Sequence, residues 1–118
     1  MITVERTGGL IAEEVFVAES FSKRLMGLMF REKMSPLTAL VIRPCNSIHT
    51  FFMRFPIDVL FVSKDSEVVA ILHGIKPWRL SKIYLNSRFV VELPEGSALR
   101  SGIRVGDKIF FSQIAKRY

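Results

Sequence analysis

The sequence has little of several residues on which structure or chemistry often depends. Its 118 residues include one cysteine and two histidines. A single cysteine cannot form an intrachain disulfide, which fits a reducing compartment. No apolar run reaches the roughly 18 residues of a membrane-spanning helix, so we expect no membrane span. The first ten residues carry Glu5, Arg6 and a Gly8-Gly9 pair and do not resemble a signal peptide, so we expect a cytoplasmic location.

The chain also lacks the short motifs that carry common enzyme chemistry. It has no glycine-rich phosphate loop, no paired-carboxylate spacing and no zinc-hydrolase motif. Zinc requires three or four protein ligands, and the spacing of Cys45, His49 and His73 matches no metal signature. We therefore expect no metal and no cofactor, and we interpret His73 as a surface or edge histidine. Whether the protein is an enzyme stays open at this point.

The composition is that of a folded protein. Hydrophobic residues make up 49% of the chain and charged residues 24%. This balance excludes a disordered protein, because enough apolar surface is present to bury a core. The length fits one domain over residues 1–118, with no linker, repeat or low-complexity tract. A chain of this size needs no disulfide or metal to hold its core.

The charge balance is basic, with 17 Lys and Arg against 11 Asp and Glu and a net charge of +6. Such a balance can indicate binding to nucleic acid or to anionic lipid. Most of the basic residues occur singly, however, and the aromatic residues Phe51, Phe52, Phe55 and Phe61 fall at predicted core positions. We therefore interpret the charge as a solvated surface and do not expect nucleic-acid binding. An interaction protein that uses its basic surface is kept as an alternative.

The pattern of apolar residues predicts a mainly β fold of the sandwich or barrel kind, with about seven or eight short strands and one α-helix. Gly8-Gly9 is predicted as a hairpin turn, 75–86 as an ordered loop and 97–101 as a single helical turn. The predicted strands are 2–6, 11–18, 38–42, 48–53, 57–62, 67–74, 89–93 and 108–114.

The one long helix is predicted at about 22–32. Phe21, Leu25, Leu28 and Met29 recur at helical spacing and form one apolar face. A serine at position 20 or 22 can cap its first turn. A glycine inside a helix costs about 1 kcal/mol relative to alanine, so we expect a close contact at Gly27.

Residues 44–58 collect the residue types that could carry chemistry. They include Cys45, His49 and Asp58, the last of which is a carboxylate inside an apolar strand. An unpaired buried charge costs several kcal/mol. We therefore expect Asp58 either to face solvent or to be received by Arg, His or backbone N–H groups.

Cys45 and His49 allow two interpretations. A catalytic cysteine requires a nearby base, and in an extended segment these residues lie roughly 13 Å apart, so a turn at Asn46-Ser47 would have to join them. An enzyme that uses Cys45 and His49 is one alternative. A small buried cysteine beside a hydrogen-bonded histidine is the other.

Polar groups set among aromatic residues are also typical of a small-molecule pocket. The guanidinium of Arg24 can bind a carboxylate or phosphate through two hydrogen bonds, or it can form a surface ion pair with Glu19, Glu32 or Asp58. The methionines allow either an adaptable soft site or simple core filling. These are Met26, Met29, Met34 and Met53.

Five short segments resemble the domain of unknown function 192 family. They run in order from about residue 20 to 111, namely 24–31, 48–53, 56–61, 89–96 and 102–107. The resemblance implies a compact, mainly β, sandwich-like domain with one helix, and it implies no activity. Ala39-Leu40 departs from the Gly-Met pair of many relatives. Many relatives also carry an export signal, which suggests the cell envelope, whereas the start of this chain suggests the cytoplasm.

The resemblance places Arg24, His49, Thr50 and Asp58 on signature positions. Such polar residues either satisfy one another or meet a ligand. Our hypothesis is a small soluble domain that binds a small polar or anionic ligand in a pocket between the helix and the strands of 49–58. Arg24 would supply charge, His49 and Thr50 would supply hydrogen bonds, Asp58 would orient Arg24 or His49, and Cys45 would complete the site.

Overall fold

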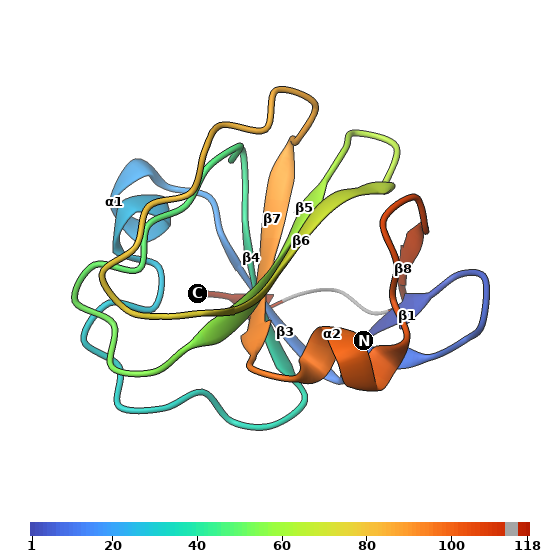
Figure 1. Ribbon diagram of the computed structural model, residues 1–118, viewed down its shortest axis with the longest axis horizontal. Helices are drawn as coiled ribbons and strands as arrows, with labels where there is room; N and C mark the ends of the chain where they lie inside the picture. The colour runs from blue at the N-terminus through green and yellow to red at the C-terminus, as the bar shows by residue number, and fades with distance from the viewer. Residues whose placement is uncertain (113–115) are drawn as a thin grey trace.

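A computed structural model describes residues 1–112 and 116–118 and consists of two sheets (Figure 1). The larger has six strands in the order β6-β5-β7-β4-β3-β9, and the smaller has three in the order β2-β1-β8. The helices are α1 (Phe21–Met26) and α2 (Ser97–Ser101). The strands are β1 (Ile2–Val4), β2 (Leu10–Ala12), β3 (Glu14–Ala18), β4 (Thr38–Ile42), β5 (Ile57–Val62), β6 (Val68–Ile75), β7 (Phe89–Pro94), β8 (Ile109–Phe111) and β9 (Lys116–Arg117).

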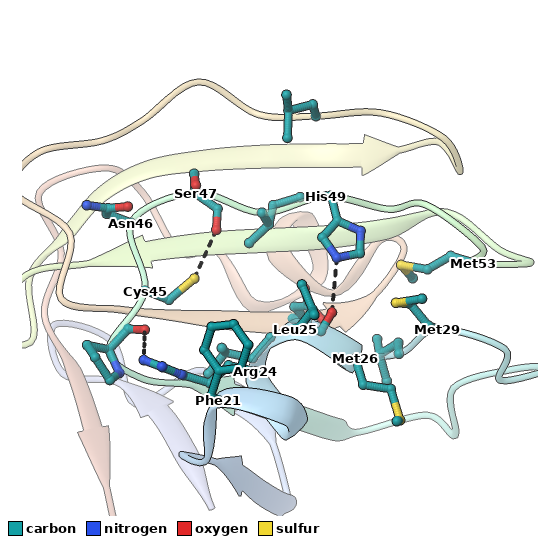
Figure 2. Close-up of a pocket in the computed structure, with 17 residues that line it drawn as sticks. Phe21, Arg24, Leu25, Met26, Met29, Cys45, Asn46, Ser47, His49 and Met53 are labelled. Atoms are coloured by element: carbon teal, nitrogen blue, oxygen red, sulfur yellow. Dashed lines mark hydrogen bonds between the residues drawn. The ribbon is translucent and has the colours of Figure 1, made fainter.

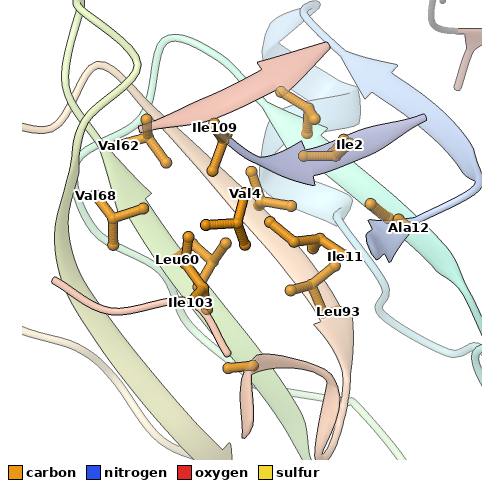
Figure 3. Close-up of a cluster of buried hydrophobic side chains, with 14 of the residues drawn as sticks. Ile2, Val4, Ile11, Ala12, Leu60, Val62, Val68, Leu93, Ile103 and Ile109 are labelled. Atoms are coloured by element: carbon orange, nitrogen blue, oxygen red, sulfur yellow. The ribbon is translucent and has the colours of Figure 1, made fainter. Parts of the chain in front are cut away.

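Strand β5 lies between β6 and β7 and is buried along its whole length. Because successive side chains of a strand point to opposite faces, β5 contributes to two cores. Leu60 and Val62 join the core beneath the small sheet, together with Ile2, Val4, Ile11 and Leu93 (Figure 3). Val59 and Phe61 join the second core on the opposite face. That core includes Leu28, Ile42, Ile48 and Met53.

The predicted mainly β class is confirmed. The predicted strand at 2–6 ends at Val4, and two other predictions differ more from the structure. The prediction at 11–18 divides at Glu13 into β2 and β3, which belong to different sheets, because the Leu37 carbonyl accepts the backbone N–H groups of both Glu13 and Glu14. The prediction at 48–53 is wrong. This segment is a loop in which Phe52 has a φ of +63° and only His49 forms a β-bridge, with Leu80.

The predicted helix at 22–32 is too long. The Ser20 hydroxyl does accept a hydrogen bond from the Lys23 N–H, at 3.2 Å, and so begins the helix as a cap. The helix ends at Met26, because Gly27 takes a φ of +48° that other residues rarely adopt. A second short helix, α2, forms where one helical turn was predicted. The end of the predicted strand at 108–114 lies partly outside the described residues, at 113–114.

Two long loops, 43–56 and 76–88, lie beside each other and beside α1 (Figure 1). The N–H groups of Thr50, Ser81 and Tyr84 donate across them to the carbonyls of Arg79, Ile48 and Asn46, at 2.8–2.9 Å. These bonds give an irregular segment a fixed backbone. Neither helix of the described chain has the length or the apolar character to cross a bilayer.

Candidate functional site

A cavity of about 320 Å³ lies between α1, the segment 44–49 and the face of the large sheet that α1 covers (Figure 2). Ile42 and Glu92 line it from strands β4 and β7. Leu28, Ile48 and Met53 are buried in its wall, whereas Leu25 and Leu80 are exposed. The cavity therefore has a mostly apolar lining and opens toward solvent beside α1.

Arg24 points from α1 to one end of this cavity. Its Nη1 donates to the Pro44 carbonyl at 3.3 Å, as Figure 2 shows, and the guanidinium lies over the Phe21 ring. Its Nε is buried and has no hydrogen-bond partner among the described residues. Among the described residues, Arg24 does not form the ion pairs with Glu19, Glu32 or Asp58 that were the alternative to a ligand. Glu19 pairs with Arg43, at 2.9 Å, and Glu32 lies 3.9 Å from Arg54.

Glu92 is a functional candidate that was not predicted from the sequence. Its side chain is 3% exposed, and Oε1 has no hydrogen-bond partner among the described residues. Burial raises the pKa of Glu92 to about 8, so at neutral pH it is mostly the uncharged acid. A Cβ placed on Gly27 would lie 3.6 Å from this oxygen, so the turn after α1 closes over it. Glu92 could have been predicted from the sequence, because it is a carboxylate inside an apolar strand, which is the pattern that made Asp58 a candidate.

Cys45 lines the cavity beside Arg24 as a half-buried thiol. Its Sγ donates to the Ser47 carbonyl at 3.0 Å. Desolvation is the largest effect on the pKa of Cys45 and raises it. The Ser47 hydrogen bond lowers this pKa by less, and Glu92 and Arg24 have still smaller raising and lowering effects. A thiol of this kind is not activated, because the reactive form is the thiolate.

His49 lines the same cavity but is not a base for Cys45. Its Nδ1 accepts the N–H of Phe51 at 3.2 Å, so the ring hydrogen is on Nε2, which donates to the Leu25 carbonyl at 3.0 Å. Both nitrogens are therefore occupied. His49 joins its loop to the end of α1, and this geometry does not favour the Cys45/His49 enzyme.

Thr50 does not line the cavity. It is fully buried, and its hydroxyl donates to the Lys76 carbonyl at 2.6 Å and accepts the Arg79 N–H at 2.8 Å. It holds the two long loops together. To contact a ligand as predicted, the Thr50 hydroxyl would have to give up its hydrogen bonds to Lys76 and Arg79.

Asp58 does not line the cavity either. Its two carboxylate oxygens accept the N–H groups of Gly74, at 2.8 Å, and Ala98, at 2.9 Å. The prediction that Asp58 orients Arg24 or His49 is therefore wrong. The reason is the alternation of β5, which turns Asp58 toward α2, on the sheet face opposite to α1.

Three methionines complete the lining at the end of the cavity near His49. Met26 comes from α1, Met29 from the turn after it and Met53 from the loop 43–56 (Figure 2). Met34 is outside the lining and lies against the second core. In residues 1–112 and 116–118, no three His, Cys, Asp or Glu side chains are grouped as they would be around a metal ion. Thioethers beside apolar side chains give this end an adaptable apolar surface.

Comparison with known proteins agrees with this architecture. Residues 2–111 match DUF192, the family described as "Uncharacterized ACR, COG1430". A UPF0127 protein of Pyrococcus furiosus is 36% identical over 110 residues, which cover 91% of this chain and 94% of the relative. A UPF0127 protein of Pyrococcus horikoshii is 41% identical over 104 residues, covering 81% of this chain and 85% of the relative. The crystal structure of a protein of unknown function from Novosphingobium aromaticivorans has the same fold, with a TM-score of 0.77, 24% identity and coverage of 93% and 83% of the two chains. The chain therefore belongs to the DUF192 family.

Proposed function

We propose that this protein is a small-molecule-binding domain whose cavity takes a ligand with an anionic head group and an apolar body. The observation that carries this proposal is a pair of buried polar atoms in one cavity, Arg24 Nε and Glu92 Oε1, both without a partner among the described residues. Buried polar groups in folded proteins are nearly always hydrogen-bonded, because each unsatisfied group costs about 1–3 kcal/mol. A bound ligand would supply the missing partners.

The charges at this end of the cavity favour an anion. Arg24 is a permanent cation with an unused N–H donor. Glu92, with a pKa raised to about 8, is mostly a neutral acid at neutral pH and can donate its O–H. A carboxylate can accept a hydrogen bond from both groups, whereas an amine would face the guanidinium. Small carboxylates are therefore the ligand class that fits best.

The remainder of the lining favours an apolar body. Leu28, Ile42 and Ile48 are buried in the wall, and the methionines can adjust to different shapes. A cavity of about 320 Å³ is at the lower end of the range for small-molecule sites. We therefore expect compact aliphatic or aromatic acids.

Isothermal titration tests this proposal with acetate, hexanoate and benzoate, each compared with its neutral amide and with an amine of equal length. We expect the apolar acids to bind more tightly than the amides and amines. Arg24→Gln should weaken hexanoate binding by tenfold or more, because a hydrogen bond to a charged group contributes about 1.5–3 kcal/mol.

Arg104→Gln is the matched control, because Arg104 is exposed and outside the cavity lining. It should leave the affinity unchanged. Equal affinities for acid and amide, or equal affinities of the Arg24→Gln variant and the original protein, would contradict the proposal.

A further inference from the structure

The end of the molecule that carries α1 exposes a large number of apolar side chains. Ten of the fourteen exposed large apolar side chains in the described residues lie in segments 21–34, 49–56 and 76–88, which we call the loop face. A soluble monomer rarely exposes so large an apolar group without a binding role. The ten are Phe21, Leu25, Met26, Phe30, Phe51, Phe52, Trp78, Leu80, Ile83 and Leu85.

The three segments form one continuous surface. The Phe30 N–H donates to the Phe52 carbonyl at 3.0 Å, and the Trp78 N–H donates to the Thr50 carbonyl at 2.9 Å. The Phe52 ring lies 5.3 Å from that of Phe30 and 4.7 Å from that of Trp78, between centroids. Figure 1 shows α1, the loop 43–56 and the first part of the loop 76–88 at one end of the molecule, with α2, β1 and β8 at the other, and the last part of 76–88 runs on to the start of β7.

The backbone of this surface is strained at its aromatic residues. Phe30, Phe52 and Trp78 have φ values of +65°, +63° and +66°. Bulky residues rarely adopt this region, and such conformations cluster at functional sites. The three side chains are also about half exposed, so the strain is not offset by deep burial. Holding aromatic rings at the surface in this way indicates a surface that meets a partner.

The loop face also concentrates the positive charge of the chain. It contains nine of the 17 Lys and Arg but only one of the 11 Asp and Glu, Glu32, while the remainder of the chain has eight basic and ten acidic residues. Basic residues that occur singly along the sequence therefore gather in these three segments. The core placement of Phe51 and Phe52 is wrong, because they are 37% and 48% exposed. The nine are Lys23, Arg24, Arg31, Lys33, Arg54, Lys76, Arg79, Lys82 and Arg88.

We propose that the loop face docks on the surface of an anionic membrane. Apolar side chains such as Leu80, Ile83 and Leu85 would enter the boundary between headgroups and acyl chains. The interspersed cations, such as Lys82 and Arg79, would meet lipid phosphates, and a surface with almost no carboxylates suits this partner.

The same observations disfavour single-stranded nucleic acid as the partner. Nucleic-acid surfaces offer open aromatic faces on which bases stack. Here the rings of Phe30, Phe52 and Trp78 are tilted against one another, at 36° and 60°. Exposed leucine and isoleucine side chains offer no stacking face, but they do partition into lipid.

Flotation with vesicles tests the proposal on the full chain, using phosphatidylcholine alone and its mixture with phosphatidylglycerol. We expect binding to the mixed vesicles, weaker with added salt, and little binding to the neutral ones. The single tryptophan, Trp78, lies on the loop face, so its fluorescence should shift to shorter wavelength on binding. No flotation with anionic vesicles, or no shift, would overturn the proposal.

Matched variants identify the surface. Ile83→Ser combined with Leu85→Ser, and separately Lys82→Glu, lie outside the cavity lining and should each weaken vesicle binding about tenfold or more. Leu99→Ser, on α2 and 83% exposed, and Lys64→Glu, also exposed, are controls that should bind as the original protein does. Equal losses in the controls would contradict the proposal. Self-association through the loop face, or oligonucleotide binding in place of vesicle binding, would also contradict it.

This inference does not depend on the cavity ligand. Glu92→Gln changes the cavity and leaves the loop face intact. It should bind vesicles as the original protein does, so failure of the ligand proposal and failure of membrane docking can be told apart.

Discussion

Asp58→Ala is expected to lower the free energy of unfolding by about 3–5 kcal/mol. The Asp58 carboxylate is 1% exposed and accepts the N–H groups of Gly74 and Ala98, which joins β5 to β6 and to the first turn of α2. Alanine removes both charge-assisted bonds and leaves two N–H groups without an acceptor. Urea denaturation followed by circular dichroism measures the loss.

Two further variants make this prediction specific. In Asp58→Asn, the amide oxygen can accept one N–H while the NH₂ group faces the other, so a loss of about 2–4 kcal/mol is expected. Asp65→Ala, in the exposed turn between β5 and β6, should change stability by less than about 0.5 kcal/mol. A loss below about 1 kcal/mol in Asp58→Ala would contradict the structural role assigned to Asp58.

Glu92→Gln is expected to stabilise the protein by about 3–5 kcal/mol near pH 8 and to have almost no effect in acid. Burial raises the folded-state pKa of Glu92 from 4.5 to about 8. Between these values the unfolded chain loses the proton more readily than the folded protein does. The stability of the original protein should therefore fall with rising pH, by about 1.4 kcal/mol per pH unit from this group.

The difference in unfolding free energy between the original protein and Glu92→Gln isolates this effect. It should grow from near zero below about pH 4.5 and level off above about pH 8. Glu95→Gln, at an exposed position just after β7, is the control for the substitution and should change the unfolding free energy by less than about 0.5 kcal/mol. A difference between the original protein and Glu92→Gln that stays constant with pH would contradict the uncharged state of Glu92 at neutral pH.

Strands in which apolar residues alternate with polar ones or form a continuous run could be predicted from the sequence, as β4 and β5 were. This pattern of side chains is a local signal. The end of α1 could not, because the apolar pattern continues past Gly27 and only the backbone shows its positive φ. The division at Glu13 also depends on a distant group, the Leu37 carbonyl.

Only part of the candidate site could be predicted from the sequence. Cys45 and His49 are close together in the chain, and Arg24 lies in a segment that resembles the family. Asp58 and Glu92 give the same local signal, a carboxylate in an apolar strand. Both faces of the large sheet are buried. The alternation of side chains along a strand therefore cannot show whether Asp58 or Glu92 points toward α1. The loop face was missed because its charges gather only when three distant segments fold together.

The central claim is that Arg24 and uncharged Glu92 together hold an anion, and the pH dependence of hexanoate affinity tests it most directly. Titrations of the original protein and of Glu92→Gln from about pH 6 to about pH 10 span the pKa of Glu92, about 8. In the original protein the affinity should be constant up to about pH 8 and then fall by up to tenfold per pH unit, because an anion binds the protonated form of Glu92. In Glu92→Gln it should not change across this interval. An affinity that rises with pH, or the same profile in both proteins, would contradict the claim.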